Sequence, residues 1–563
     1  MTTPVSATSK VRTARRLAAA CAVAALLAAA APGAGAQATT AGSLEIATTS
    51  KAIPEAPELV IEDGAIRLGL EDAVAIALAR NLDVAIERYA RERSLYGVRS
   101  ANGAFDLRAG LGFSLAENDS PSISQVEGVP VLQTDNRSVS GRLDQFTPWG
   151  GEATLLFSGI RRSTNSADVL VQPDYSATAR IELFQPLLRD FGRLPATRNV
   201  LVARLSSGIS RQDFERRVSE ILLQVEFAYW NLVEAREQLV VARESLNLAE
   251  DLHGRNKIQV DVGTLAPIEL VQSEATIALR QEDIISAEAT QRDSVDELLR
   301  LLNLPDAMAE GLDLTPLTEP ETTPLDIDLE EAIATAHDER PELAAQRLVI
   351  EQLQIDSKLA RNQTLPRADL RAGYGSAGIG GRGLIPLPDG TVLNLDSDLT
   401  DAFQDVLDRD FTGWSLGVSF SYPLQNRTAR AERVIADLAF DEGKARLSQL
   451  ELQVITEVRS AARAVRTAAQ QIESARATRN LQERNLDAEQ KRYENGMSDS
   501  FRIAEIQNDL TEARSREVTS VTNYRKALVD YRQSIGRLLE ENGVTLVGPE
   551  DEAPTKRRFS LFG

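Results

Sequence analysis

Two long stretches of this chain contain no proline, and they restrict its fold more than any other feature of the sequence. No proline occurs between Pro195 and Pro267, and none occurs between Pro423 and Pro549. Within both stretches apolar residues recur every three or four positions, which is the spacing of one helix face. At ~1.5 Å of rise per residue, a helix over 197–260 would be roughly 95 Å long, and one over 427–493 would be similar. The sequence therefore predicts two helices far longer than the usual length of about a dozen residues.

Each long helix is predicted to end at a glycine and to be followed by a second helix. The first turn reads VGTLAP, in which Gly263 breaks the helix and Pro267 begins the next one. The second reads NGMSDS, in which Gly496 is the breaker and Ser498 or Asp499 is the N-cap. The returning helices are predicted over 267–302 and 499–541. Each half of the chain thus contains a long antiparallel helical hairpin.

Short segments with the alternation of strands lie between the helices. They read FDLRAGLGFSL, SVSGRLDQF, EATLLFSGI, YSATARIELFQPL, ADLRAGYG and GWSLGVSFSYPL, which makes about six strand candidates. The second and third flank the turn TPWGG and are typical of a hairpin. Two polar, glycine-rich segments, roughly 116–136 and 376–410, are predicted to be loops.

The two halves of the chain share one order of elements. The pentapeptide DLRAG occurs at Asp106–Gly110 and again at Asp369–Gly373. Upstream of it, LGLEDAVAIALARNLDVAIERYA at 68–90 aligns with IDLEEAIATAHDERPELAAQRLV at 327–349. Downstream, each half continues with strands, a long helix, a glycine turn and a return helix. We interpret this order as an internal duplication.

The first residues have the pattern of a secretory signal peptide. A basic segment precedes the apolar run LAAACAVAALLAAAA, and Ala34-Gly35-Ala36 then supplies small residues before Gln37, the predicted mature start. The run is shorter than the ~20 residues of a membrane span. Almost no apolar run precedes Cys21, so we do not expect lipid attachment there, and the mature chain is predicted to contain no cysteine. The predicted segments are a signal peptide at 1–36, an N-terminal extension at 37–66, a first repeat at 67–312, a linker at 313–324, a second repeat at 325–546 and a basic tail at 547–563.

Composition and charge argue against several functions. The formal net charge is −21, and without the four basic residues of the predicted signal it becomes −25, unlike the basic face that nucleic-acid binding needs. His253 and His337 have no neighbours at metal-ligand spacing, and GYGSAG from Gly373 lacks the following helix of a dinucleotide-binding loop. No catalytic constellation occurs in the sequence. We predict no enzymatic activity, no cofactor and no metal site.

In this order of elements the chain resembles the TolC-type outer membrane efflux proteins over about 68–543. The paired openings LEDAVAIALARN and LEEAIATAHDERPEL carry the resemblance, as do the phrases FQPLLRDFGR and SYPLQNRTARAE and the turns VGTLAPIELVQSE and NGMSDSFRIAEIQ. The resemblance implies an α+β fold in which long antiparallel helical hairpins form a periplasmic tunnel. Four strands per chain would join a twelve-stranded β-barrel that a homotrimer shares in the lipid of the outer membrane. The hairpin at TPWGG is extra to four strands, and it either extends the barrel outward or lies in the outer loops.

The same resemblance implies a passive exit duct of a tripartite efflux pump or type I secretion system. Such a protein connects a periplasmic adaptor and an inner-membrane transporter to the exterior. The resemblance places adaptor-contacting tips at the two glycine turns and a periplasmic gate just beyond the second turn. The tip residues are Val262, Gly263, Thr264, Asn495, Gly496 and Met497, and the gate candidates are Asp499, Arg502, Glu505 and Asp509. Arg502 stands where a member of the family has an acid, so an Arg–Glu latch is an alternative to an acidic ring.

Other interpretations of the same residues stay open. A secreted or periplasmic coiled-coil scaffold or adhesin would use the long helices without entering a membrane, although the doubled strands weigh against it. An envelope hydrolase has less support, because no nucleophile or metal constellation occurs. Trp149 and Trp414 lie near strand ends and are candidates for membrane-interface anchors or for ordinary packing. The gate candidates could equally be solvated charges, and the sequence does not identify the cargo as drug, metal ion, polysaccharide or protein.

Overall fold

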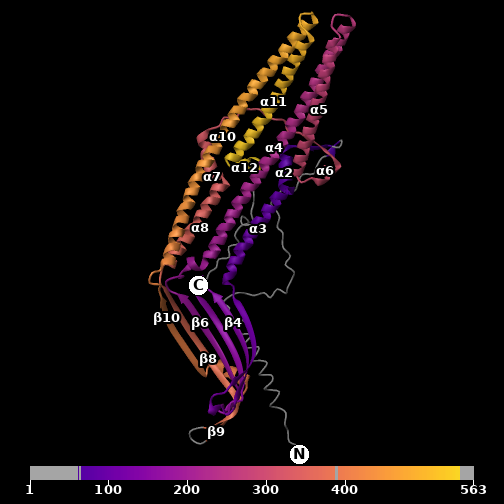
Figure 1. Ribbon diagram of the computed structural model, residues 1–563. Coiled ribbons are helices and arrows are strands. Elements are labelled where there is room, and N and C mark those ends of the chain that lie inside the picture. Colours follow the sequence, from indigo (N-terminus) through magenta and orange to yellow (C-terminus); the bar gives the residue numbers. More distant parts are fainter. Residues whose placement is uncertain (1–60, 63–64, 387–390, 545–563) are drawn as a thin grey trace, which may run out of the picture. The chain divides into compact units, whose positions relative to one another are not determined.

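The computed structural model describes residues 61–62, 65–386 and 391–544 (Figure 1). The predicted signal peptide, most of the predicted N-terminal extension and the predicted basic tail lie outside these residues. The described chain divides into two compact units. A strand unit comprises Asn102–Arg198 and Leu359–Arg433, and a helical unit comprises the described residues of 50–101, 199–358 and 434–563.

The strand unit is built around one antiparallel sheet in which long strands lie side by side (Figure 1). Its main strands are β3 (Arg108–Pro121), β4 (Val131–Phe146), β5 (Glu152–Thr164), β6 (Val171–Pro186), β8 (Arg367–Pro386) and β10 (Phe411–Ser421). Their order across the sheet is β10-β8-β6-β5-β4-β3. A short strand, β9 (Val392–Asp396), pairs with the end of β8. GYGSAG lies within β8 and is followed by further strand residues.

The sheet differs from the four strands per chain that the resemblance implies. β4 and β5 run between β3 and β6 as full members, so the hairpin at TPWGG belongs to the sheet. The loop predictions were also wrong in part. Residues 116–121 and 131–136 are strand, and 376–410 contains the end of β8, β9 and the helix α9 (Leu399–Asp408). Polar residues and glycines suggested loops there, but pairing with a neighbouring strand satisfies the backbone whatever the side chains are.

The helices follow the same order in both halves of the chain, which confirms the α+β fold and its internal duplication. The first half has α2 (Leu70–Arg80), α3 (Leu82–Asn102), α4 (Arg193–Asp261) and α5 (Ile268–Leu301). The second half has α7 (Leu329–Glu339), α8 (Pro341–Gln363), α10 (Arg427–Glu494) and α11 (Ser500–Ser534). The two long helices contain 69 and 68 residues, as the absence of proline predicts. Shorter helices are η1 (Gly103–Phe105), η2 (Gln125–Glu127), α6 (Pro305–Glu310) and α12 (Leu538–Glu541).

A small sheet that sequence reasoning missed joins the two ends of the first half. β2 (Ala65–Leu68) pairs in parallel with β7 (Asp313–Pro316), and β1 (Ile61–Glu62) pairs with β2. Ile66, which we placed at the end of the extension, is fully buried in this sheet. The strands of two to four residues are too short to show an alternating pattern, so no periodic signal predicts them.

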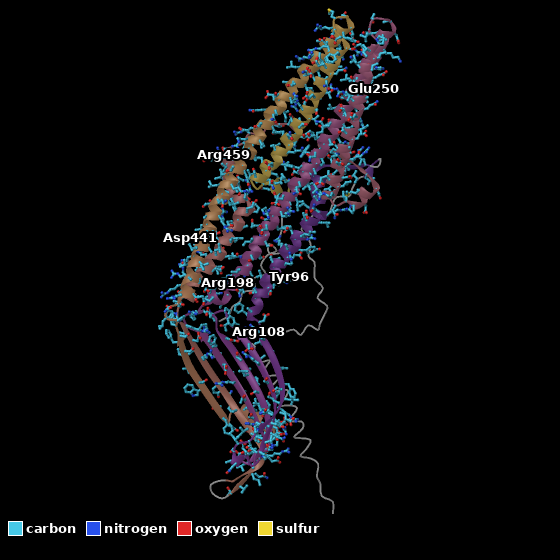
Figure 2. All side chains as sticks on the ribbon, viewed as in Figure 1. Tyr96, Arg108, Arg198, Glu250, Asp441 and Arg459 are labelled. Atoms are coloured by element: carbon cyan, nitrogen blue, oxygen red, sulfur yellow. The ribbon has the colours of Figure 1, made fainter. Side chains whose placement is uncertain are left out.

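Apolar side chains inside the helical unit form three clusters. The first surrounds Tyr229 and Trp230, whose rings meet edge to face at 5.5 Å between centroids. The second uses smaller side chains of α10, such as Val458 and Ala461. The third joins α4, α10 and α11 near the glycine turns. Charged side chains cover the outside of these helices, for example Glu250 on α4 and Arg459 on α10 (Figure 2).

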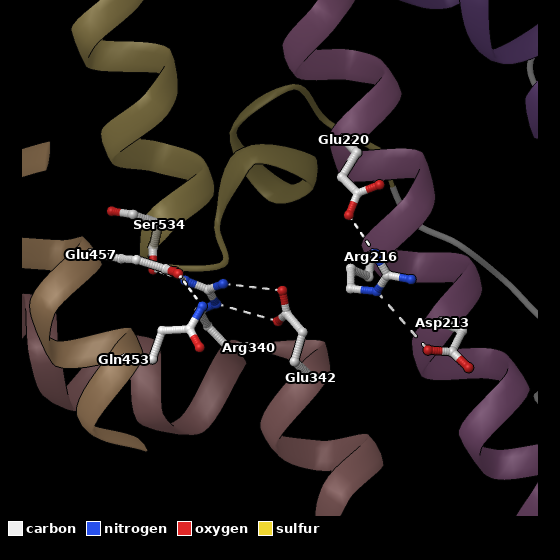
Figure 3. A network of polar contacts seen from close by, with 8 residues as sticks. All are labelled: Asp213, Arg216, Glu220, Arg340, Glu342, Gln453, Glu457 and Ser534. Atoms are coloured by element: carbon white, nitrogen blue, oxygen red, sulfur yellow. Dashed lines mark hydrogen bonds and ion pairs between the residues drawn. The ribbon is translucent and has the colours of Figure 1, made fainter. Parts of the chain in front are cut away.

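The junction between α7 and α8 is held by a partly buried arginine, Arg340 (Figure 3). Arg340 Nη1 lies 2.6 Å from Glu457 Oε2, and its Nη2 lies 3.0 Å from Glu342 Oε1. Nη1 also donates to the carbonyl oxygen of Ser534, the last residue of α11. Burial opposes the charge of Arg340, but the two carboxylates raise its pKa above the ordinary value overall. The guanidinium therefore stays charged and ties α8 to α10 and α11.

The equivalent junction between α2 and α3 uses an asparagine for the same purpose. Asn81 Nδ2 donates to the carbonyl oxygen of Leu301, the last residue of α5, at 2.8 Å. Its Oδ1 accepts from the backbone N–H groups of Asp83 and Val84 at the start of α3. Both repeats therefore fix the end of the return helix to the same junction, through different chemistry.

Candidate functional site

The two faces of the sheet differ in polarity, because successive residues of a strand point to opposite faces. In β3, Leu111 and Phe113 alternate with Gly112 and Ser114. The strand register carries this alternation to the neighbouring strands, and beyond Val139 the same face holds the ion-paired Asp135, Arg137 and Arg161. One row of register partners on the apolar face is Ala109, Leu143, Leu155, Ile181, Tyr374 and Trp414.

Large side chains on the apolar face are exposed to a degree that is unusual for a folded chain. Leu111 is 94% exposed and Trp414 is 79% exposed. We call the exposed set the apolar belt, and it comprises Leu111, Phe113, Leu115, Val139, Ile181, Leu183, Tyr374, Trp414, Leu416, Val418 and Phe420. A contiguous patch of this kind marks a surface that contacts protein or lipid.

The opposite face carries arginine–carboxylate pairs that repeat from strand to strand. Arg142 Nε lies 2.6 Å from Asp144 Oδ1 on β4. Arg180 Nε lies 3.2 Å from Glu182 Oε1 on β6, and Arg367 Nε lies 2.8 Å from Asp369 Oδ2 on β8. Each pair has one residue between its members, so both side chains lie on the polar face. A shallow hollow on this face is lined by Arg142, Glu152, Thr154, Arg180, Glu182, Arg371 and Ser415.

Sequence reasoning missed these pairs, although a signal for them was present. The spacing Arg-x-Asp or Arg-x-Glu occurs within two predicted strands, and Arg367 stands directly before a third. In a strand this spacing places both charges on one face. Glycine on the neighbouring strand makes room for the long side chains: a Cβ at Gly375 would lie 3.2 Å from Cγ of Arg180.

Helix α9 covers part of the apolar face where the strand residues are small. Ala402 and Val406 of α9 are buried against Ala177 of β6. A Cβ at Gly378 would lie 1.9 Å from the carbonyl oxygen of Ala402, and one at Gly159 would lie 2.9 Å from the ring of Phe403. Asp398 begins the helix with a capping box. The glycines after Tyr374 therefore admit a helix against the sheet.

The two glycine turns have the same backbone geometry. Gly263 has φ of 80° and Gly496 has φ of 71°, the left-handed conformation of a helix C-terminus. Thr264 N–H donates to the carbonyl oxygen of Gln259, and Met497 N–H donates to that of Arg492. All six tip residues are exposed, and their backbone bonds match a Schellman motif in both turns.

The four gate candidates lie on one exposed side of the first turns of α11. Asp499 is the N-cap, and its side chain accepts a hydrogen bond from the backbone N–H of Arg502. Arg502 Nη1 lies 2.5 Å from Glu505 Oε2, so the structure brings these two residues together. Asp509 is exposed further along the helix. The opposite side of α11 is buried through Ile503, Ile506 and Leu510.

Polar contacts that sequence reasoning missed bind the two hairpins together near the turns. Tyr493 Oη donates to Asn256 Oδ1 at 2.7 Å in a buried position. Burial and the nearby carboxylate of Glu269 raise the pKa of Tyr493, so the phenol stays protonated. Ser500 Oγ donates to Glu269, and Arg280 donates to Asn508. The first turn of α11 is therefore held by α4 and α5 on one side and exposed on the other.

The remaining sequence candidates have ordinary surroundings. Trp149 is exposed in the turn between β4 and β5, and Trp414 belongs to the apolar belt. His253 Nδ1 lies 2.8 Å from Ser273 Oγ, and His337 Nε2 lies 3.3 Å from Glu451 Oε1. Among the described residues, no cluster of histidine, cysteine, aspartate and glutamate could hold a metal ion. Within the same residues, no helix has both the length and the hydropathy needed to cross a membrane.

Comparison with known proteins shows which family the chain resembles. Residues 332–537 match the family model described as outer membrane efflux protein. Over these residues, a little over a third of the chain, it is similar to the outer membrane efflux protein family. As in that family, it is an outer membrane protein with its helical part in the periplasm. A curated relative, the alkaline protease secretion protein AprF of Pseudomonas aeruginosa, is 26% identical over 226 residues. That match covers 39% of this chain and 45% of the relative, which is less than half of its length.

Solved structures of outer membrane channels share the fold over most of the chain. The CmeC outer membrane channel of Campylobacter jejuni has a TM-score of 0.59 at 16% identity, covering 83% of this chain and 86% of CmeC. CusC has a TM-score of 0.61 at 14% identity, covering 83% and 92%. The open-state MtrE channel of Neisseria gonorrhoeae has a TM-score of 0.55 at 15% identity, covering 83% and 89%. These identities are low, so the likeness concerns the fold.

Proposed function

We propose that three copies of this chain form a passive exit duct through the outer membrane, which serves a tripartite efflux pump or a type I secretion system. An inner-membrane transporter supplies the energy, and a periplasmic adaptor joins that transporter to the duct. The chain itself carries no catalytic step. Its own contribution is a wall with one apolar and one polar face, and a set of long helices that end in exposed turns.

The apolar belt is the single observation that carries this proposal. From Trp414 to Phe420 it extends roughly 20 Å along β10 at ~3.4 Å per residue. This is close to the ~25 Å height of the outward apolar band of outer-membrane proteins. The charged pairs on the other face then line an aqueous lumen. A coiled-coil scaffold or adhesin that never met lipid would have no use for such a belt, because exposed apolar patches promote aggregation.

The open edges of the sheet support association of several copies. β3 and β10 form the two edges of the main path. Backbone groups at an open edge cannot face hydrocarbon without large cost, because lipid offers them no hydrogen-bond partner. The apolar residues Ile268, Val271, Leu279 and Ile285 are also exposed along α5. Neighbouring copies would cover both kinds of surface, which favours the homotrimer.

We assign the adaptor contact to the two glycine turns and the gate to the start of α11. The six tip residues are exposed, and a Cβ at either glycine would meet open space, so a partner can approach both turns closely. Arg502 and Glu505 form an exposed ion pair within one helix. Around a threefold axis, six alternating charges of this kind would attract one another between copies and hold the entrance closed.

The relative AprF suggests a choice between the two kinds of system. AprF is an alkaline protease secretion protein, so a polypeptide is a candidate cargo for this duct as well. The match covers less than half of AprF, and drug, metal ion and polysaccharide cargoes stay open. Because the transporter and adaptor select cargo in such systems, residues of this chain are expected to influence conductance more than cargo choice.

Single-channel conductance in a planar bilayer tests the proposal. The purified trimer is expected to show a small conductance, and Arg502→Ala combined with Glu505→Ala is expected to raise it several-fold. The matched control is Glu512→Ala with Arg516→Ala, which removes another ion pair from the same helix farther from the turn. If neither double substitution changes the conductance, the gate lies elsewhere in the chain. A folded trimer that forms no pore would contradict the duct itself.

A further inference from the structure

We propose that each chain supplies six strands to the wall, so that three copies close a sheet of eighteen strands. The β3 edge of one copy would pair with the β10 edge of the next. This inference rests on the trimer of the proposed function and departs from the twelve strands that the family resemblance implies. The difference comes from the hairpin of β4 and β5.

The hairpin strands are full members of the sheet, not an extension of its rim. β4 pairs with β3 continuously from Arg108↔Asp144 to Pro121↔Val131. β5 pairs with β6 from Glu152↔Phe184 to Arg162↔Asp174. Between them, β4 and β5 pair from Phe146↔Glu152 to Thr134↔Thr164. Without the hairpin, β3 would have to pair with β6 directly, and this register leaves no place for that pairing.

The hairpin also continues both faces of the wall. Val139 of β4 lies opposite Phe113 of β3, and Leu155 of β5 lies opposite Ile181 of β6, all on the apolar face. On the polar face, Ser114 Oγ lies 2.7 Å from Ser138 Oγ, and Ser158 Oγ lies 2.7 Å from Thr178 Oγ1. A hairpin in the outer loops would not be expected to alternate apolar and polar residues in register with β3 and β6.

The two edges are suited to each other. All six strands are antiparallel to their neighbours, so β3 and β10 run in opposite directions and would meet as an antiparallel pair. Every residue of β10 is exposed, and so is every residue of β3 except one. Edge strands are usually guarded by charge or proline. β10 reads FTGWSLGVSFS and has neither, as expected for an edge that a second copy covers.

The extra strands would widen the lumen. With ~4.8 Å between strands and a tilt of ~40°, eighteen strands give a backbone diameter of roughly 36 Å, against roughly 24 Å for twelve. Closed sheets of 16–18 strands leave an aqueous channel. The arginine–carboxylate pairs of β4, β6 and β8 would then line the wall of a wide polar lumen instead of filling it.

Electron cryo-microscopy of the full chain in detergent micelles counts the strands directly. Eighteen strands with 131–164 inside the wall are expected. Twelve strands with 131–164 outside the wall would overturn this inference and leave the proposed duct intact. If no closed trimer were found, both the inference and the duct would fail.

Cysteine labelling in liposomes tests the placement of the hairpin by a second route. Cys21 lies in the predicted signal peptide, so the mature chain offers a cysteine-free background. A water-soluble maleimide is expected to label Ser138→Cys and Ser158→Cys at least tenfold faster than Val139→Cys and Phe157→Cys. Ser114→Cys and Leu111→Cys on β3 are the matched pair, because β3 belongs to the wall in either arrangement. Equal labelling of all four hairpin positions, with the β3 pair still split, would overturn the inference.

Discussion

The two return helices, α5 and α11, occupy the same place in the two repeats but have different surroundings. Along α11 the buried residues extend from Ser500 to Ser534. In α5 they are Ser273 and four residues after Asp293. α11 bonds with α4 along its length, for example from Gln507 Nε2 to the carbonyl oxygen of Leu248. α5 instead exposes an apolar stripe. Within a single chain, α11 is therefore packed along its length, whereas most of α5 is left exposed.

The long helices that precede them show the same divergence from a common pattern. Gly496 follows Gly263 by 233 residues, and this shift maps buried positions of α4 onto buried positions of α10. Val225 falls on Val458 and Leu232 on Val465, whereas Tyr229 falls on Ala462. The duplication has kept one stripe of core positions and changed its volume, whereas the buried Trp230 falls on the exposed Arg463. Divergence after duplication thus left α11 buried along its length and α5 with an exposed apolar stripe, which in the proposed trimer a neighbouring copy would cover.

The largest effect is expected where charge enters the exposed stripe of α5. Leu279→Glu with Ile285→Glu should prevent trimer formation, because two carboxylates would be buried without partners between copies. Native mass spectrometry in detergent would then report monomers. The helical unit should keep its fold, since both side chains are exposed in one chain.

The matched control adds the same charges to other parts of α5. Gln272→Glu with Gln281→Glu keeps the apolar stripe intact, and both residues are exposed. This variant should remain a trimer. If the stripe variant also remains a trimer, then α5 does not contact a second copy, and the difference between the two hairpins has another cause.

Much of the fold was predictable because its signals are local and repeated. The long helices follow from the absence of proline, and the turns follow from glycine at a helix C-terminus. The number of strands in the sheet was not predictable in the same way. The alternation of Ser138–Phe146 shows a strand but not its partner, because register depends on residues far away in sequence. α9 was hidden for the same reason, since Gly378 and Gly380 indicate a loop until the helix that they admit is seen.

The candidate site was predictable only in part. The sequence located the exposed turns and the start of α11, because caps and breakers are short-range features. It did not show that Arg502 and Glu505 meet, or that Tyr493 bonds Asn256, which is 237 residues away. Roles in gating and adaptor contact stay predictions, because one chain alone contains neither the threefold axis nor the adaptor.

A smaller effect is expected from a buried acid that only the first repeat contains. Glu226 of α4 is buried and accepts a hydrogen bond from Asn542, and the 233-residue shift maps it onto the exposed Arg459 of α10. Burial raises the pKa of Glu226 against the opposing effects of Asn542 and nearby arginines. The folded state then holds its proton more tightly than the unfolded state does. Stability is therefore lost as pH rises from about 4.3 through the raised folded value.

Glu226→Gln should remove this dependence. The melting temperature of the variant, measured by circular dichroism in detergent, should match that of the wild type at the lowest pH and exceed it increasingly as pH rises. Arg459→Gln is the control at the equivalent position. Its melting temperature should differ from that of the wild type by the same amount at every pH. A gap between Glu226→Gln and wild type that stays constant or shrinks with rising pH would contradict the assignment.

The smallest effect concerns the N-termini of the return helices. α11 begins with the side chain of Asp499 bonded to the backbone N–H of Arg502, whereas α5 begins at Pro267 without a side-chain cap. Asp499→Ala should cost about 1 kcal/mol of local stability, which is roughly a fivefold faster hydrogen exchange in the first turn of α11. Asp499→Asn should retain most of the protection, since asparagine caps equally well. Exchange in the first turn of α5 should not change. Equal exchange rates for Asp499→Ala and wild type would mean that contacts with α4 and α5, rather than the cap, hold the start of α11.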